Sequence, residues 1–252
     1  MKKGRIIIIL NVIILLLMGC GKRTISSEDM DKILSDFLKS NYEYTATYYE
    51  VAPDGKETYA YTYEGQLISD PYQQYEKRTE FSSSAMVSAL LEIYAYEKEG
   101  LIYDDMRLDT YDNDSMWMVG NRTAKISDLY AVEGLDFKFS RKEKTGDFNA
   151  FVFTTQYETM SITKTEDKSI ETPCNMKLEY YVDPRSREIV RIVVDDEEVA
   201  REGAIAMKIT EGETKENAAK IVQKEGVEKN KIVIDIKNLG GEFVIHRPDT
   251  SE

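Results

Sequence analysis

The chain has 252 residues, with 33 lysines and arginines against 46 aspartates and glutamates, so its formal net charge at pH 7 is −13. Nucleic acids are excluded as expected partners, because binding to phosphates depends mainly on lysine and arginine. The two cysteines and one histidine exclude a disulfide-rich scaffold and a metal site built from several histidines. Hydrophobic residues make up 42%, which is enough for a folded core.

The first residues have the parts of a secretory signal in the usual order. Lys2, Lys3 and Arg5 form a basic start, and residues 6–18 are apolar except for Asn11. As a helix, residues 6–18 would span about 20 Å, short of the roughly 30 Å hydrocarbon core of a bilayer. A signal peptide therefore explains this segment better than the alternative, a short permanent membrane anchor.

The apolar run ends in Leu17-Met18-Gly19-Cys20. This ending resembles the lipobox of bacterial lipoproteins, in which a small residue precedes the cysteine, although Met18 is bulkier than is usual at its position. The resemblance implies that the Cys20 thiol carries a diacylglycerol and that cleavage leaves Cys20 as the N-terminus. We therefore expect an extracytoplasmic protein that is anchored to a bacterial membrane through lipidated Cys20.

The remaining chain has no long proline- or serine-rich linker and no internal repeat, which favours one domain. We expect a lipoprotein signal peptide over residues 1–19, a lipidated tether over 20–27, a single β-rich domain over 28–248 and a polar tail over 249–252. Cys174 would be the one free thiol, and we expect it to be a small buried residue beside a strand.

An amphipathic helix is predicted over residues 28–40, with Ser26 or Ser27 as its N-cap. From Asn41 the hydrophobic period changes to two, which predicts a tyrosine-rich β-hairpin over residues 41–65. Residues 86–96 fit either a helix or a strand; a strand is preferred because residues 98–100 turn into a second apolar run.

Short strands continue to the end of the chain, interrupted by two helices. The helices are predicted over residues 128–132, after a Ser127 cap, and over residues 214–224. The sequence Asp195-Asp196-Glu197-Glu198 is interpreted as a hairpin turn. The further strands are predicted over residues 72–81, 101–108, 116–119, 148–157, 159–165, 175–182, 188–195, 203–210, 231–236 and 242–245.

These elements predict a mainly β fold of the α+β class, a single curved antiparallel sheet or half-barrel of about ten strands. The order of helix, tyrosine-rich hairpin, Gly-Gln-Leu-Ile-Ser-Asp-Pro-Tyr strand, short strand with Trp117, and Leu-Glu-Tyr-Tyr-Val-Asp-Pro hairpin resembles the carrier lipoproteins of the LolA, LolB and LppX type. That resemblance implies a half-open β-barrel capped by helices, with an apolar cavity for acyl chains. It assigns no ligand residue, because no position-specific motif matches.

Catalytic and metal-binding motifs are missing from the sequence. A nucleophile–histidine–acid triad would have to use His246, and no nucleophile elbow or phosphate loop is present. The acidic run from Asp104 to Asp114 offers oxygens for Ca²⁺, but Trp117 stands where an EF-hand loop starting at Asp112 needs glycine. We expect solvated carboxylates there, no cofactor, no metal and no enzymatic activity.

Tyrosine is the residue type that stands out, with 17 copies. A tyrosine ring has an apolar body and a polar tip, which suits amphiphilic ligands and protein partners. Whether the tyrosines form a core, a cavity wall or an exposed binding face stays open. The hairpin tyrosines would share one face if the register pairs them. The candidate ligand-facing aromatic residues are Tyr42, Tyr44, Tyr48, Tyr59, Tyr61, Tyr63 and Trp117.

Three functions follow from these observations. The leading hypothesis is a membrane-anchored lipoprotein that binds a lipid or another amphiphile. The alternative is a tethered module that binds another protein of the cell envelope through a sheet edge or an aromatic face. An envelope hydrolase is the third, and two carboxylates with raised pKa in one cleft would favour it.

Overall fold

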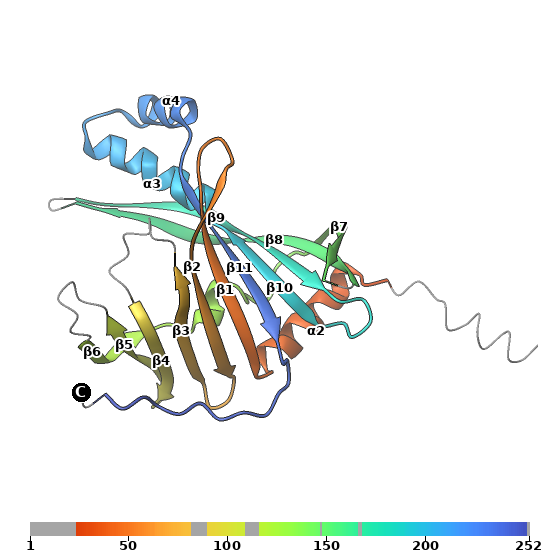
Figure 1. The fold of residues 1–252 in the computed structure, drawn as a ribbon. Coiled ribbons are helices and arrows are strands. Elements are labelled where there is room, and N and C mark those ends of the chain that lie inside the picture. The colour runs from red at the N-terminus through yellow and green to blue at the C-terminus, as the bar shows by residue number, and fades with distance from the viewer. Residues whose placement is uncertain (1–23, 82–89, 109–115, 147, 166–167, 251–252) are drawn as a thin grey trace, which may run out of the picture.

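One antiparallel sheet of eleven strands dominates the computed structural model, which describes residues 24–81, 90–108, 116–146, 148–165 and 168–250. The strand order is β6-β5-β4-β3-β2-β1-β11-β10-β9-β8-β7. The end strands β6 and β7 do not pair with each other, so the sheet is open (Figure 1). The prediction of a mainly β fold with a curved antiparallel sheet and accompanying helices is confirmed.

The sheet consists of two meanders joined by the last strand, β11, which lies between β1 and β10. The first meander contains β1 (Tyr42–Val51), β2 (Glu57–Ile68), β3 (Gln73–Phe81), β4 (Leu90–Lys98), β5 (Leu101–Leu108) and β6 (Met116–Thr123). The second contains β7 (Lys138–Thr145), β8 (Phe148–Lys164), β9 (Ser169–Val182) and β10 (Ile189–Asp195), and β11 is Lys229–Lys237.

Helix α2 (Ser27–Leu38) begins with a capping box. The Ser26 hydroxyl accepts a hydrogen bond from the Asp29 amide, and the Asp29 carboxylate accepts one from the Ser26 amide. This confirms the predicted helix and its serine cap. The apolar stripe of the helix is buried in the main core by Met30, Ile33, Leu34 and Phe37.

The two faces of the sheet differ in character. We call inner the face that carries Tyr42, Tyr44 and Ala46 of β1, which are buried in one cluster with the stripe of α2. The opposite face, which we call outer, has a smaller apolar cluster around Val152 and Tyr181. The main core therefore lies between the inner face and α2.

Helix α3 (Glu197–Thr210) corrects two predictions, a strand over residues 203–210 and a hairpin turn at residues 195–198. The Glu197 amide donates to the Asp195 carboxylate at 3.0 Å, so these acidic residues start a helix instead of a turn. Helix α3 packs on the far ends of β8 and β9, where the Ser161 hydroxyl donates to the Val199 carbonyl at 3.0 Å.

Helix α4 (Lys215–Glu225) confirms the second predicted long helix and packs against α3 (Figure 1). Other boundaries were predicted wrongly. The strands over 148–157 and 159–165 are one strand, β8, and β7 was not predicted. Residues 242–245 are irregular, and the short helix is a 3₁₀ turn over Ile126–Leu129 without a side-chain cap.

The C-terminal residues run along the sheet without joining it. Ile245 is buried, and the Arg247 guanidinium lies 2.8 Å from the fully buried carboxylate of Asp105 and over the ring of Tyr96. Within the described residues, the helices are too short or too polar to cross a bilayer.

Candidate functional site

The register of the β1–β2 hairpin places its tyrosines on both faces of the sheet. Tyr48 pairs with Tyr61, and their rings stack with centroids 4.5 Å apart. The pairing then skips Ala60, so Tyr59 pairs with Tyr49 and lies on the outer face. The expectation of one shared face is therefore wrong for Tyr59. The inner face keeps Tyr42, Tyr44, Tyr48, Tyr61 and Tyr63.

Trp117 is not brought together with these tyrosines. It pairs with Arg107 across β5 and β6, on the outer face. The neighbouring pair on β5 and β6, Met106 and Met118, lies on the inner face. The candidate aromatic residues thus form one group of five on the inner face, with Tyr59 and Trp117 outside it.

Three of the five inner-face tyrosines are buried, Tyr63 at 7% exposure together with Tyr42 and Tyr44. Tyr42 is 1% exposed; its ring stacks on Phe37 of α2, and its hydroxyl lies 3.0 Å from that of Tyr130. Tyr44 is 2% exposed. Tyr48 and Tyr61 keep partly exposed rings, so they are the members of the group that solvent or a ligand can reach.

A chain of buried polar groups crosses the inner face beside these rings. The Tyr72 hydroxyl donates to Gln74 at 2.5 Å, and the Gln74 amide donates to the Tyr44 hydroxyl at 3.0 Å. The Tyr44 hydroxyl in turn donates to the Glu76 carboxylate at 2.7 Å. Burial raises the pKa of Glu76 to about 7, and the hydrogen bond from Tyr44 opposes this rise. Glu76 therefore changes its charge near neutral pH.

A cavity of about 540 Å³ opens on the inner face at the C-terminal end of α2; we call it the inner-face cavity. Its wall is apolar or aromatic at Leu38, Tyr42, Leu67 and Tyr72 and at Ala131 and Val132. Its polar lining consists of Ser69, Lys125, Ser127, Asp128 and Glu133. The Lys125 ammonium lies 5.1 Å from the ring centroid of Tyr72. An apolar wall with a few polar groups is the composition expected of a small-molecule site.

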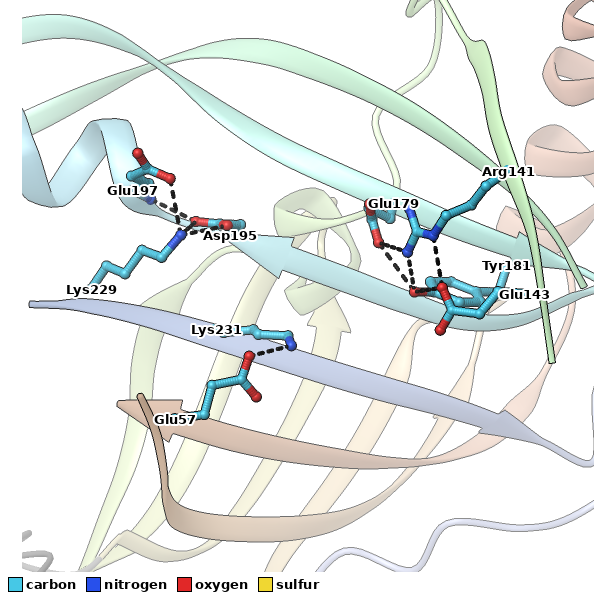
Figure 2. A network of polar contacts seen from close by, with 9 residues as sticks. All are labelled: Glu57, Arg141, Glu143, Glu179, Tyr181, Asp195, Glu197, Lys229 and Lys231. Atoms are coloured by element: carbon cyan, nitrogen blue, oxygen red, sulfur yellow. Dashed lines mark hydrogen bonds and ion pairs between the residues drawn. The ribbon is translucent and has the colours of Figure 1, made fainter. Parts of the chain in front are cut away.

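A larger hollow of about 1050 Å³, which we call the outer-face groove, lies mostly against the outer face. Charged side chains line much of it, and several of them pair with one another (Figure 2). The Lys229 ammonium lies 2.8 Å from Asp195 and 3.0 Å from Glu197, and the Lys231 ammonium lies 2.7 Å from Glu57. Asp136, Lys138, Glu158 and Lys177 add further charges to the lining, so the polarity of the groove does not suit an acyl chain.

A second charged group lies at one end of the groove (Figure 2). The Arg141 guanidinium makes two hydrogen bonds to Glu179, of 2.8 and 2.9 Å, and one to Glu143 of 2.7 Å. These bonds lower the pKa of Glu179, with Arg141 as the main cause. Tyr181 lies beside the pair and receives a hydrogen bond from Arg141 at 2.9 Å. This group ties β7 to β9 and offers no unpaired charge to a ligand.

Two inner-face carboxylates have a raised pKa, the property that would favour a hydrolase. Burial is the main cause for both Glu76 and Asp104. Glu76 lies on β3 and Asp104 on β5, with β4 between them. Gln74 pairs with Ala95 and Ala95 pairs with Asp104, so Glu76 is offset from Asp104 by two residues along the strand. Strand spacing then separates their Cα atoms by about 12 Å. Their side chains also turn apart, because Glu76 is hydrogen-bonded to Tyr44 of β1 and Asp104 faces Asn121 and Thr123 of β6.

The remaining sequence candidates show no sign of chemistry. His246 is exposed in the irregular C-terminal segment. Cys174 is buried on β9, its thiol lies 3.8 Å from the Thr159 carbonyl, and burial raises its pKa, as expected for a structural thiol. No group of three acidic, histidine or cysteine residues in the described ranges is arranged to hold a metal ion. In the acidic run, Asp104 and Asp105 are buried, which corrects the expectation of solvated carboxylates there, and the acidic residues from Asp109 to Asp114 lie outside those ranges.

The sequence did not reveal most of the cavity. Its wall combines Leu38 at the end of α2, Leu67 on β2 and residues 125–133, which no local pattern connects. The alternation of Tyr72, Gln74 and Glu76 is a visible signal in hindsight, because residues two apart on a strand share a face. Because Gln74 and Glu76 are polar, the sequence did not indicate that this face of β3 is buried.

Comparisons with known proteins give a structural likeness only. No family model matches the chain, and no curated protein matches it. Among solved structures the chain is similar to LprF from Mycobacterium bovis, with a TM-score of 0.41, 10% identity, and 90% of this chain and 99% of that chain covered. It is also similar to the Mycobacterium tuberculosis lipoprotein LppX, with a TM-score of 0.37, 8% identity, and 88% of this chain and 100% of that chain covered. At TM-scores below 0.5 the likeness is descriptive, so what the chain binds has to be inferred from its own residues.

Proposed function

We propose that this chain is a membrane-anchored extracytoplasmic lipoprotein that binds a lipid or another amphiphile in the inner-face cavity. The observation that carries the proposal is the cavity itself, about 540 Å³ with an apolar wall and polar groups among its lining. That volume lies within the range of known ligand pockets, roughly 300 to 1,000 Å³. The outer-face groove is larger but is lined by many charged side chains, so it is a poorer site for an apolar chain.

The two kinds of lining match the two parts of an amphiphile. Leu38, Leu67 and Val132 offer apolar contact to a hydrocarbon tail. Lys125 offers a positive charge and hydrogen-bond donors to a headgroup, while Asp128 and Glu133 oppose a strongly anionic one. A mixed lining of this kind favours a headgroup that carries both a negative group and neutral or positive groups.

The anchor rests on the sequence around Cys20. One acyl chain gives marginal membrane binding, so the two or three chains of a lipidated cysteine are needed for a durable anchor. Residues 20–27 would then be the tether, with residues 1–19 removed and residues 28–248 forming the binding domain. The Ser26 capping box lies at the end of that tether, and α2 begins there at Ser27. Removal of residues 1–19 with their three positive charges takes the net charge from −13 to −16, and this charge disfavours contact of the domain with anionic headgroups.

Native mass spectrometry of residues 21–252, which include every described residue, tests ligand binding. We expect a stoichiometric lipid to co-purify or to bind when it is added. Val132→Trp should weaken this binding, because the indole would occupy part of the cavity. Val119→Trp is the matched control, since Val119 is 54% exposed on β6. A protein that is empty and also ignores added lipids and apolar dyes would contradict the proposal.

Labelling of cells with an alkyne analogue of palmitate tests the anchor separately. The full chain should take up the label and fractionate with membranes, and Cys20→Ala should do neither. Label on the Cys20→Ala variant would contradict lipidation at this residue.

The second candidate is the tethered interaction module, and one observation favours it. Met160 and Ile162, two apolar residues on the outer face of β8, are 43% and 56% exposed. Exposed apolar side chains that lie together on a strand are typical of a surface that another protein covers. An envelope hydrolase has no such support, since the two carboxylates with raised pKa turn apart.

A further inference from the structure

The outer edge of β8 is open over a long stretch. β7 pairs with β8 only as far as Thr154, and residues 134–136 lie beside Thr154–Tyr157 at the outer-face groove. From Glu158 to Lys164, β8 has a neighbouring strand on one side only among the described residues, and that strand is β9. The paired ends of β8 and β9 project beyond the sheet as a two-stranded arm (Figure 1). The arm therefore exposes backbone groups that can pair with another strand.

This edge lacks the usual protection against pairing. Natural edge strands carry proline, bulges or inward-pointing charges that prevent another strand from joining. Between Glu158 and Lys164 there is no proline and no charge, β8 pairs with β9 without a bulge, and Met160 and Ile162 are exposed. The other edge of the arm differs, because β9 has Pro173 there and Asn175 is hydrogen-bonded to Glu198 of α3.

The sequence of this edge is complementary to itself. In an antiparallel pair of two copies centred on Ser161, Glu158 lies opposite Lys164 of the second copy, and Met160 lies opposite Ile162 of the second copy. Twofold symmetry makes each of these pairs occur twice. All four residues lie on the outer face, because they are two positions apart along the strand. Neither Glu158 nor Lys164 has an ion-pair partner among the described residues, so both are available.

Helix α3 leaves this edge accessible. It packs on the inner face, where the Thr163 hydroxyl donates to the Gly203 carbonyl at 3.4 Å, and it also contacts β9 and β11. It therefore covers the inner face over β8 and β9 and leaves free the outer face, where the apolar and charged pairs would meet. Ser161, the residue on the symmetry axis, is small and buried beneath α3, so two copies meet there without a bulky side chain.

We propose that two copies of this chain associate through the outer edges of their β8 strands, antiparallel and centred on Ser161, so that the two arms form one four-stranded ribbon. The backbone of Glu158–Lys164 supplies the ladder of hydrogen bonds. The pairs Glu158–Lys164 and Met160–Ile162 set the register. This dimer does not depend on whether the inner-face cavity holds a lipid.

A charge exchange tests the register. Sedimentation of residues 21–252, from micromolar to submillimolar concentration, should show a reversible monomer–dimer equilibrium. Lys164→Glu puts an acidic residue opposite Glu158 of the other copy at both symmetry-related pairs. This variant should raise the dimer dissociation constant about tenfold. The double variant Glu158→Lys with Lys164→Glu restores both pairs and should return the constant to within about threefold of the original. Glu171→Lys, an exposed reversal on β9 of the same arm, is the control and should leave it unchanged.

A disulfide gives a second readout that does not rely on charge. Met160→Cys chains mixed with Ile162→Cys chains should form a mixed disulfide faster than either chain alone, because these positions lie opposite each other across the edge. A chain that stays monomeric throughout the concentration range overturns the proposal. So does a dimer that Lys164→Glu does not weaken, or one that the double variant does not restore.

Discussion

Tyr44 donates a hydrogen bond of 2.7 Å to the carboxylate of Glu76, and both side chains are at most 2% exposed. A tyrosine hydroxyl stabilises the carboxylate, but burial disfavours the negative charge more strongly and raises the pKa of Glu76 to about 7. The inner face therefore contains an acid that is half protonated at neutral pH.

This pKa predicts a specific loss of stability at high pH. Glu76 is protonated in both the folded and unfolded states below its unfolded pKa of about 4.5. Between that pH and about 7 the folded state binds more protons, so the free energy of unfolding falls as the pH rises. The total loss is on the order of 3 kcal/mol by pH 8, and the folded-state advantage is complete only at acidic pH.

Glu76→Gln isolates this contribution, because glutamine keeps a partner for Tyr44 and does not titrate. Urea unfolding at pH 5, 6.5 and 8 should show that the variant loses less stability than the original chain over this range. Glu64→Gln, an exposed substitution on β2, is the control. Parallel pH profiles for the original chain and Glu76→Gln would contradict the raised pKa.

Gly65 makes room for the Tyr44 ring. A Cβ atom at Gly65 would lie within about 2.2 Å of the ring. Gly65→Ala should therefore displace Tyr44 and destabilise the protein by about 1 to 3 kcal/mol, as overpacking does in other cores. Denaturant midpoints measure this loss. Glu64→Ala, the neighbouring residue on the exposed side of β2, should change stability by less than about 0.5 kcal/mol, and an equal loss in both variants would argue against a steric cause.

The strong hydrophobic periodicities predicted the curved sheet and helix α2 correctly. Strand β7 and helix α3 were missed, and their sequences show why. Helix α2 was predicted because an apolar stripe follows a capping serine. The edge strand β7 has alternating charge and few buried residues, so its sequence has no apolar face to detect. In α3, residues 203–210 fit a strand locally, and only packing on β8 and β9 selects the helix.

Of the seven candidate aromatic residues, Tyr42 alone is among the described residues that line the inner-face cavity, and contact of any of the seven with a ligand stays a prediction. Five of the seven candidate aromatic residues share the inner face. Tyr59 was misplaced because the irregularity at Ala60 shifts the alternation by one residue, and nothing local in the sequence marks that shift. The inner-face cavity joins Leu38, Leu67 and Lys125 through long-range packing. A pattern confined to one strand cannot reveal such a combination.

Arg247 should hold the C-terminal segment on the sheet. Its guanidinium contacts the Asp105 carboxylate, which is fully buried and also accepts a hydrogen bond from the Gly120 amide at 2.9 Å. Arg247→Ala leaves a buried carboxylate with one partner fewer and should destabilise the protein by about 1 to 3 kcal/mol. Hydrogen exchange should also become faster around Ile245. Arg201→Ala, which breaks exposed pairs on α3, is the control and should cost less than about 1 kcal/mol; equal effects would contradict a special role for Arg247.

Lys125 should decide which headgroup the inner-face cavity prefers. Among the described residues it is the only cation that lines the cavity, where Asp128 and Glu133 carry the opposite charge. Lys125→Ala should weaken binding of lysophosphatidylglycerol about three- to tenfold, since one partly exposed charge pair contributes roughly 1 kcal/mol. Lysophosphatidylcholine should lose less, because its ammonium group meets the two acidic residues. Calorimetric titration measures both affinities. Lys138→Ala, at the outer-face groove, is the matched control and should leave both affinities unchanged. If Lys125→Ala weakens both lipids equally, Lys125 supports the cavity wall and does not read the headgroup charge.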